Sequence, residues 1–176
     1  MCLDESRFHR CLRCGGPGRL RQHHPQVHVV DDVQQACVDE LLAPLLRYLW
    51  AGGCSTVASC QASRRDGDSE DWAHITFADG HSFDAGVQQL WRFCRGQEPA
   101  LRTRLADMGS GTSRPPGVWQ HSLFVYPERR LGDEMLRLYH LLELPTSDLI
   151  AINEVFSQVD KGDPSAADGS RSAWTT

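Results

Sequence analysis

The sequence predicts an α+β fold, in which a small, mostly antiparallel sheet is packed by helices. Three observations support this prediction. Segments with an apolar residue at every third or fourth position, typical of helices, are interspersed with short segments rich in β-branched and aromatic residues. The length of 176 residues fits one domain with a small appendage. Apolar residues make up 40% of the chain, which allows an ordinary hydrophobic core.

The first long element is expected to be a bent helix over residues 33–50. Its apolar residues recur at helical spacing, and Asp31 or Asp32 can cap its first turn. Gly52 and Gly53 can end it, because glycine accepts left-handed backbone angles. Pro44 cannot donate the helical hydrogen bond, so we expect a kink near Ala43.

Strands are expected next, at 54–60 and 72–78, separated by a polar surface loop over residues 62–72. The dipeptide Asp79-Gly80 is a strong signal for a hairpin, with residues 81–84 returning as a short strand. Asp84 can then cap a helix over residues 85–94.

The rest of the chain is expected to hold three more helices and one more strand. Pro127 is expected to end the strand, and Pro145 to separate the last two helices. The predicted elements are a helix at 100–108, a loop at 109–117, a strand at 118–126, and helices at 131–144 and 147–159. The predicted organisation is a basic Cys/His-rich knuckle (1–30), an α+β domain (31–160) and a disordered tail (161–176).

Charge separates the N-terminal segment from the rest. Residues 1–28 carry five arginines and two acidic residues, whereas the remainder carries 13 basic and 21 acidic residues. The acidic body argues against a general nucleic-acid-binding surface, but the basic arm could contact a nucleic acid or an acidic protein locally.

No apolar run approaches the roughly 20 residues that span a bilayer, and MCLDESRFHR lacks the apolar core of a signal peptide. We therefore expect a cytoplasmic protein without membrane contact. Its seven cysteines then favour metal ligation, buried thiols or a reactive thiol over disulfides.

The N-terminal segment carries a spacing typical of metal ligands. Cys11 and Cys14 form a C-x-x-C, and with His24 and His28 they give C-x2-C-x9-H-x3-H. Zinc binds four such soft or borderline ligands in a tetrahedron, so we expect a compact zinc knuckle. The central gap is too short for a DNA-reading finger of the C2H2 type.

Alternatives remain for this segment. His9 and Cys2 are competing ligands, and Cys54 and Cys60 could join the N-terminal cysteine pair at a metal. A redox C-x-x-C usually starts a helix, whereas two glycines and a proline follow Cys14. The segment could also be a basic arm with no metal.

A second cysteine motif, LWAGGCSTVASCQ, runs from Leu49 to Gln61. It resembles a group of small uncharacterised bacterial and phage proteins that share L-W-x-x-G-x-x-T-x-x-S-C-Q, followed by a variable loop and a strand ending near Phe. The similarity extends from Leu49 to about Phe83, and this chain has Ala62 where members often have glycine. The resemblance implies no established activity.

The thiol of Cys60 is a candidate nucleophile. If 54–60 pairs with 72–78, His74 lies within reach as its base; His81 and His121 are alternative partners. Ser59 and Gln61 could line this site, with Gln61 donating to an oxyanion. Cys60 could equally be a small buried hydrophobic residue.

These observations give three functional hypotheses. The first is a small intracellular zinc-binding module with an accessory or binding role. The second is a thiol-dependent enzyme that uses Cys60 and a nearby histidine. The third is contact with nucleic acid through the arginine-rich N-terminal arm.

Overall fold

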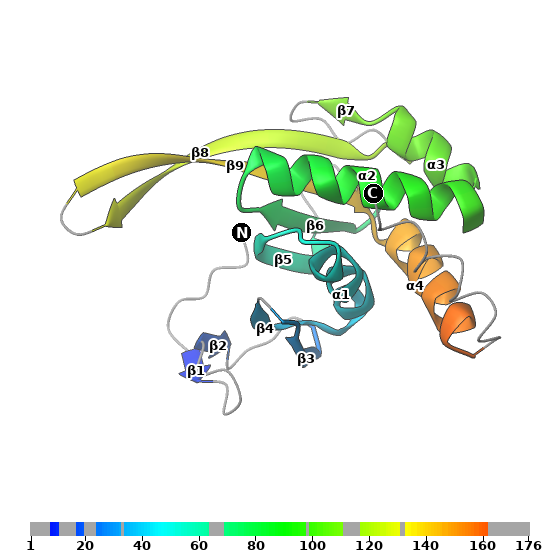
Figure 1. The fold of residues 1–176 in the computed structure, drawn as a ribbon, viewed down its shortest axis with the longest axis horizontal. Helices are drawn as coiled ribbons and strands as arrows, with labels where there is room; N and C mark the ends of the chain where they lie inside the picture. The colour runs from blue at the N-terminus through cyan, green and yellow to red at the C-terminus, as the bar shows by residue number, and fades with distance from the viewer. Residues whose placement is uncertain are drawn as a thin grey trace, which may run out of the picture.

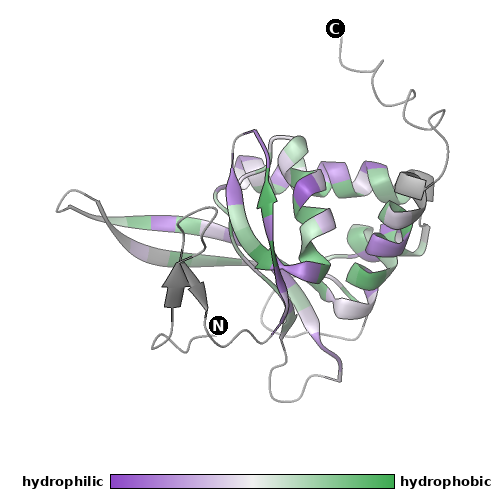
Figure 2. Ribbon diagram, turned by 90° about the horizontal axis from the view of Figure 1, so that it is seen from below, coloured by the Kyte–Doolittle hydropathy of each residue, from purple (hydrophilic) through white to green (hydrophobic). Residues whose placement is uncertain are grey.

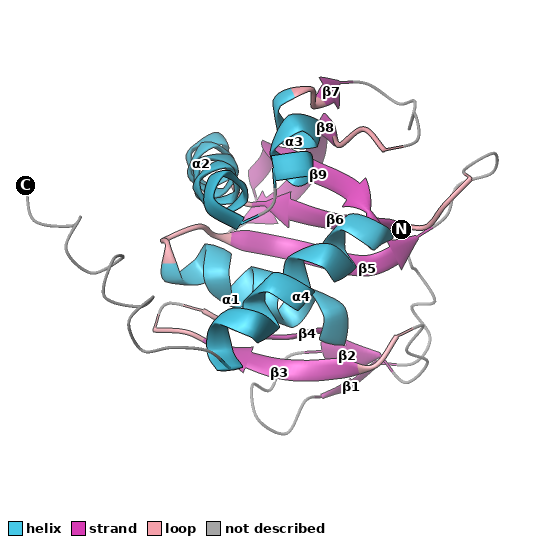
Figure 3. Ribbon diagram, turned by 90° about the vertical axis from the view of Figure 1, so that its right-hand side faces the viewer, coloured by secondary structure: helices cyan, strands magenta, loops and turns pink. Residues whose placement is uncertain are grey.

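The computed structural model describes residues 8–10, 17–19, 24–32, 34–63, 69–97, 99–110, 117–130 and 133–161 (Figure 1). Within these residues the fold is α+β, as predicted: a mostly antiparallel five-stranded sheet carries helices on one face (Figure 3). None of the helices in these ranges is long and apolar enough to cross a membrane.

The sheet has the strand order β5-β6-β9-β8-β7. Its neighbours are antiparallel except for the parallel pair β7 and β8. The predicted strands at 54–60, 72–78 and 118–126 are confirmed with shifted ends. The strands are β5 (Thr56–Ser63), β6 (Trp72–Phe77), β9 (Asp133–Pro145), β8 (Gln120–Arg130) and β7 (Gly109–Ser110).

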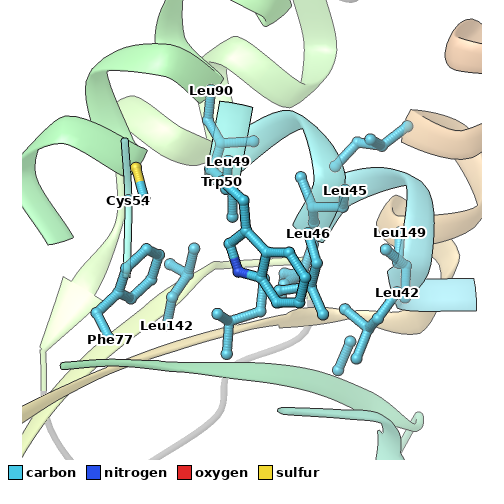
Figure 4. Close-up of a cluster of buried hydrophobic side chains, with 14 of the residues drawn as sticks. Leu42, Leu45, Leu46, Leu49, Trp50, Cys54, Phe77, Leu90, Leu142 and Leu149 are labelled. Carbon is cyan, nitrogen blue, oxygen red and sulfur yellow. The ribbon is translucent and has the colours of Figure 1, made fainter. Parts of the chain in front are cut away.

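The helices bury one face of this sheet. Ile75, Phe77, Leu142 and Leu144 alternate along β6 and β9 and point into the core. Leucines from the helices meet them there (Figure 4). The predicted helices at 85–94, 100–108 and 147–159 are confirmed within longer or shifted elements. The helices are the short 3-10 turn η1 (Glu40–Leu42), α1 (Ala43–Ala51), α2 (Gly80–Gln97), α3 (Pro99–Ala106) and α4 (Thr146–Lys161).

Two small hairpins precede the sheet. One pairs β1 (Phe8–Arg10) with β2 (Pro17–Arg19), and the other pairs β3 (Gln26–Val30) with β4 (Gln35–Asp39). Val29 of β3 and Val38 of β4 are buried in the same core as the helices. Residues 26–30 therefore pack with the α+β body.

The expectation of one bent helix over 33–50 is wrong in its first half. Residues 35–39 form β4, and α1 begins at Ala43. Pro44 lies in the first turn of α1, where the N–H that proline lacks would have no helical partner. Proline therefore starts this helix, and the glycines at 52 and 53 end it as predicted.

Two further local predictions are wrong. Residues 81–84 belong to α2, because the Asp79 carboxylate accepts a hydrogen bond from the Ser82 N–H at 2.7 Å and caps a helix instead of turning a hairpin. Residues 133–145 form β9, where pairing with both β6 and β8 overrides the helix propensity of Leu, Met and Glu.

The β8–β9 hairpin runs past the body as a two-stranded arm (Figure 2). Large apolar side chains on the arm are exposed, among them Leu123, Val125, Leu136 and Leu138. The expectation that Pro127 ends the strand is wrong, because β8 continues to Arg130. Beyond Ser122 the described residues pair β8 with β9 alone, so β8 is an edge strand there and accommodates a proline.

The alternation along β9 predicts very different costs for two leucine truncations. Leu142→Ala is expected to lower the free energy of unfolding by about 2–5 kcal/mol, because it leaves a cavity in the core. Leu136→Ala, at a side chain that is 77% exposed, is expected to change it by less than about 0.5 kcal/mol. Urea denaturation followed by circular dichroism measures both. Equal losses would contradict the assignment of faces.

Candidate metal centre

Three potential metal ligands converge where the β3–β4 hairpin meets the sheet. One ring nitrogen of His24, one carboxylate oxygen of Asp39 and the sulfur of Cys60 lie within 4.8 Å of one another. Asp39 and Cys60 are buried, at 7% exposure each, and His24 is half-buried. The residues come from the approach to β3, the end of β4 and the middle of β5, so the tertiary fold brings them together.

Asp39 is held in place by two donors. The Gln61 N–H donates to Oδ2 at 3.0 Å, and the Gln26 side-chain amide donates to Oδ1 at 3.2 Å. These bonds offset part of the cost of burying a carboxylate. They also fix its position against β5.

The carbonyl of Ala62 organises the other two members. It lies 3.0 Å from His24 Nε2 and 3.3 Å from Cys60 Sγ. A carbonyl oxygen can only accept, so both groups donate to it. For Cys60 this bond requires the S–H form, because a thiolate has no proton to donate.

Gln61 links the elements around this cluster. Its side-chain carbonyl accepts from the Leu41 N–H at 2.8 Å, and its backbone carbonyl accepts from the Thr146 hydroxyl at 3.0 Å. Gln61, which the sequence predicts as an oxyanion donor, thus uses its amide oxygen to bind the backbone of the 3-10 turn η1. Ser59 pairs with Ile75, a residue of the helix-covered face, and so lies on the opposite side of β5 from Cys60.

His74 lies directly opposite Cys60, as the pairing of the two predicted strands required. The register continues across the sheet from Cys60 to His74, to Glu143 and to Gln120. Paired residues share a face, so these four side chains form a polar row on the face away from the helices. Glu143 and Gln120 are 1% and 2% exposed.

The other two candidate partners of Cys60 are elsewhere. His81 is exposed on α2, and His121 pairs with the core residue Leu142 on the helix-covered face. There His121 Nε2 lies 3.1 Å from His140 Nδ1, and the Phe83 ring stacks on His121 with 4.2 Å between centroids.

The predicted N-terminal ligands are only partly described. Cys11 and Cys14 lie outside the described residues, as do most of the arginines of the basic arm. His28 lies on β3 opposite Cys37, with 3.8 Å between its Nδ1 and the Cys37 sulfur. Of the two knuckle histidines, which are both described, the structure brings His24 to Cys60.

Cys54, an alternative ligand, is a core residue. It is 1% exposed, and its sulfur accepts a hydrogen bond from the Gln89 amide at 3.2 Å. Burial raises the pKa of its thiol to about 11, so Cys54 stays protonated near neutral pH.

Sequence reasoning missed Asp39 and Glu143. Asp39 lies in the segment that the sequence predicts to be helical, whereas the structure places it at the end of β4. Glu143 interrupts the apolar run LLEL. A charged residue inside an alternating, strand-like run was the signal that could have indicated a buried functional carboxylate. Comparisons with protein-family models, curated proteins and solved structures found no match to this chain.

The link through Gln61 predicts a measurable loss of stability. Gln61→Leu keeps the approximate volume but leaves the Leu41 N–H without its acceptor, so the free energy of unfolding is expected to fall by about 1–3 kcal/mol. Chemical denaturation measures this. Gln88→Leu, at an exposed position of α2, is the matched control and should cost far less. An equal loss in both variants would argue against the link.

The histidine pair predicts a pH dependence of stability. Burial lowers the pKa of His121 below its ordinary 6.5, and His140 lowers it further, whereas Asp84 opposes the shift. The folded state therefore binds fewer protons at this site than the unfolded state. Its stabilisation is present above pH 6.5 and is lost as the pH falls below that value.

We expect His121→Gln to reduce the fall in unfolding free energy between about pH 7.5 and 5, measured by urea titration at several pH values. Gln88→Leu changes an exposed position of α2 and no titratable group, and should keep the wild-type profile. A His121→Gln profile as steep as the wild type would refute this assignment.

Proposed function

We propose that this chain is a zinc-binding module whose metal is held by His24, Asp39 and Cys60. The observation that carries the proposal is the convergence of these three donor atoms within 4.8 Å, from three separate segments. Such a cluster, built by tertiary structure and largely buried, supports a metal site better than neighbouring acids on a surface would.

The donor set favours zinc among the common metals. A thiolate is a poor ligand for calcium or magnesium, which take oxygen ligands. Zinc accepts cysteine sulfur, histidine nitrogen and aspartate oxygen in one tetrahedral site. The Nε2–H that His24 donates to the Ala62 carbonyl leaves its Nδ1 for a metal, whereas Cys60 must lose the proton that it donates to the same carbonyl when zinc binds.

This centre shares His24 with the knuckle that the sequence predicts from Cys11, Cys14, His24 and His28. One histidine can bind one zinc through a given nitrogen, so the two ligand sets lead to different mutational results. A zinc thiolate also requires reduced cysteine, which fits the cytoplasmic location proposed from the sequence. An accessory or binding role, with a protein or nucleic acid contacting the basic arm, completes this proposal.

The test is the zinc content of the purified full chain, measured by elemental mass spectrometry. We expect about one zinc per chain, lost in Cys60→Ser and strongly reduced in Asp39→Asn. Cys37→Ser changes a half-buried cysteine of β4 outside the cluster and is the matched control, expected to keep its zinc.

A chain without zinc after growth and refolding with the metal would overturn the proposal. If zinc were lost in Cys11→Ser/Cys14→Ser but kept in Cys60→Ser, the N-terminal knuckle would be the metal site instead. Loss in His24→Gln is expected under either ligand set and serves as the shared positive control.

The second candidate function is a thiol-dependent enzyme. The pairing of Cys60 with His74 favours it, because neighbouring thiol and imidazole side chains are the usual pair for nucleophilic catalysis. It predicts that Cys60 in the metal-free chain reacts with iodoacetamide faster than the buried Cys94, and that His74→Gln slows this reaction. Equal rates for both cysteines would exclude this function.

A further inference from the structure

Resting on the zinc site proposed above, we infer that His74 supplies the fourth ligand of the centre and that Glu143 orients its imidazole. The three convergent donors leave one position of a tetrahedral zinc site to be filled. The polar row on the sheet offers a histidine, His74, directly opposite Cys60, and this residue suits the fourth position.

The register places His74 next to the cluster. Cys60 and His74 are directly opposed across β5 and β6, where facing Cβ atoms are about 4.5–5.5 Å apart. The imidazole of His74 is not part of the 4.8 Å cluster as its side chain stands. Binding of zinc therefore requires this ring to turn toward Cys60, a rotation about side-chain bonds with no change in the strands.

Glu143 lies on the other side of His74. It is its direct partner across β6 and β9, and it is 1% exposed. A buried carboxylate is costly unless polar groups surround it, and its two facing neighbours in the sheet are His74 and Gln120. The pairing of the strands therefore places the Glu143 carboxylate beside His74, the proposed ligand.

The order along this row matches a recurrent arrangement in zinc sites. A zinc-bound histidine commonly donates its other ring N–H to a carboxylate, which fixes the tautomer and the ring orientation. With Cys60 on one side and Glu143 on the other, His74 can present a lone pair to the metal while its second nitrogen donates to Glu143. Glu143 is thus a positioning residue, and His74 a ligand.

The remaining histidines of the sheet do not compete for this position. His121 and His140 lie on the helix-covered face with Phe83 stacked against them. Neither can reach Cys60 without passing through the sheet. Within the described part of the five-stranded sheet, His74 is therefore the histidine that shares a face with Cys60.

The experiment compares full-length variants by zinc affinity and by cobalt absorption. Zinc dissociation constants are obtained by competition with a chromophoric chelator, and Co²⁺ reports the geometry of the site. We expect His74→Ala to weaken zinc binding by at least about 100-fold, and Glu143→Gln to weaken it by about 10–100-fold. His81→Gln, which removes an exposed histidine of α2 outside this row, is the matched control and should leave it within about threefold.

Cobalt gives the readout that a merely structural role would not change. In His74→Ala and Glu143→Gln we expect weaker visible d–d bands from a distorted site, with the thiolate-to-cobalt charge-transfer band of Cys60 retained. Urea denaturation of the metal-free variants checks folding, and His74→Gln replaces His74→Ala if the latter does not fold.

The outcomes separate the two proposals. If wild-type chain binds zinc and loses it in Cys60→Ser, while His74→Ala keeps wild-type affinity and cobalt spectrum, this inference is overturned and the three-ligand site stands. If only Glu143→Gln is unchanged in both readouts, the positioning role of Glu143 is overturned. A wild-type chain without zinc overturns both proposals.

Discussion

One residue of β5, Gln61, connects the sheet, the β3–β4 hairpin and the helical layer through three hydrogen bonds. The Gln61 N–H holds Asp39 at the end of β4, its amide oxygen accepts from Leu41, and its carbonyl accepts from Thr146 at the start of α4. Because these bonds join segments far apart in the sequence, they define where the hairpin meets the sheet. The cluster of His24, Asp39 and Cys60 exists only if this junction is formed.

The alternation of side chains along each strand places the core residues on one face of the sheet and the polar row on the other. On β6 and β9, Ile75, Leu142 and Leu144 face the helices and fill the core, whereas His74 and Glu143 face the other way. A shift of register by one residue would bury the polar row among leucines and expose the core. The core that sets the register therefore also aligns Cys60, His74 and Glu143 in one row.

The sequence predicted the elements whose signals are local. Amphipathic spacing located α2 and α4, and β-branched runs located β5 and β6, so the pairing of Cys60 with His74 followed from two short segments. The helix predicted for this region is wrong for residues 133–145. The helix propensity of their Leu, Met and Glu residues is outweighed by hydrogen-bonded pairing with two neighbouring strands. Pro44 was assigned to the interior of a helix that it in fact begins, and this error hid β4 and with it Asp39. The site could not be predicted for a further reason. Asp39 approaches Cys60 through a tertiary contact, which no local sequence pattern encodes.

The zinc and thiol functions make opposite demands on Cys60. As a zinc ligand, its thiolate is committed to the metal, and binding energy is gained when His24, Asp39 and Cys60 are brought together, so metal binding and docking of the hairpin stabilise each other. As a nucleophile, the sulfur has to be accessible and activated by His74. The structure gives Cys60 7% exposure, a carbonyl acceptor at 3.3 Å and a carboxylate within 4.8 Å. A carboxylate beside the sulfur disfavours an isolated thiolate, but a divalent cation between them turns the same arrangement into an attractive one. The Asp39 carboxylate beside Cys60 therefore favours the proposed metal site over the proposed nucleophile.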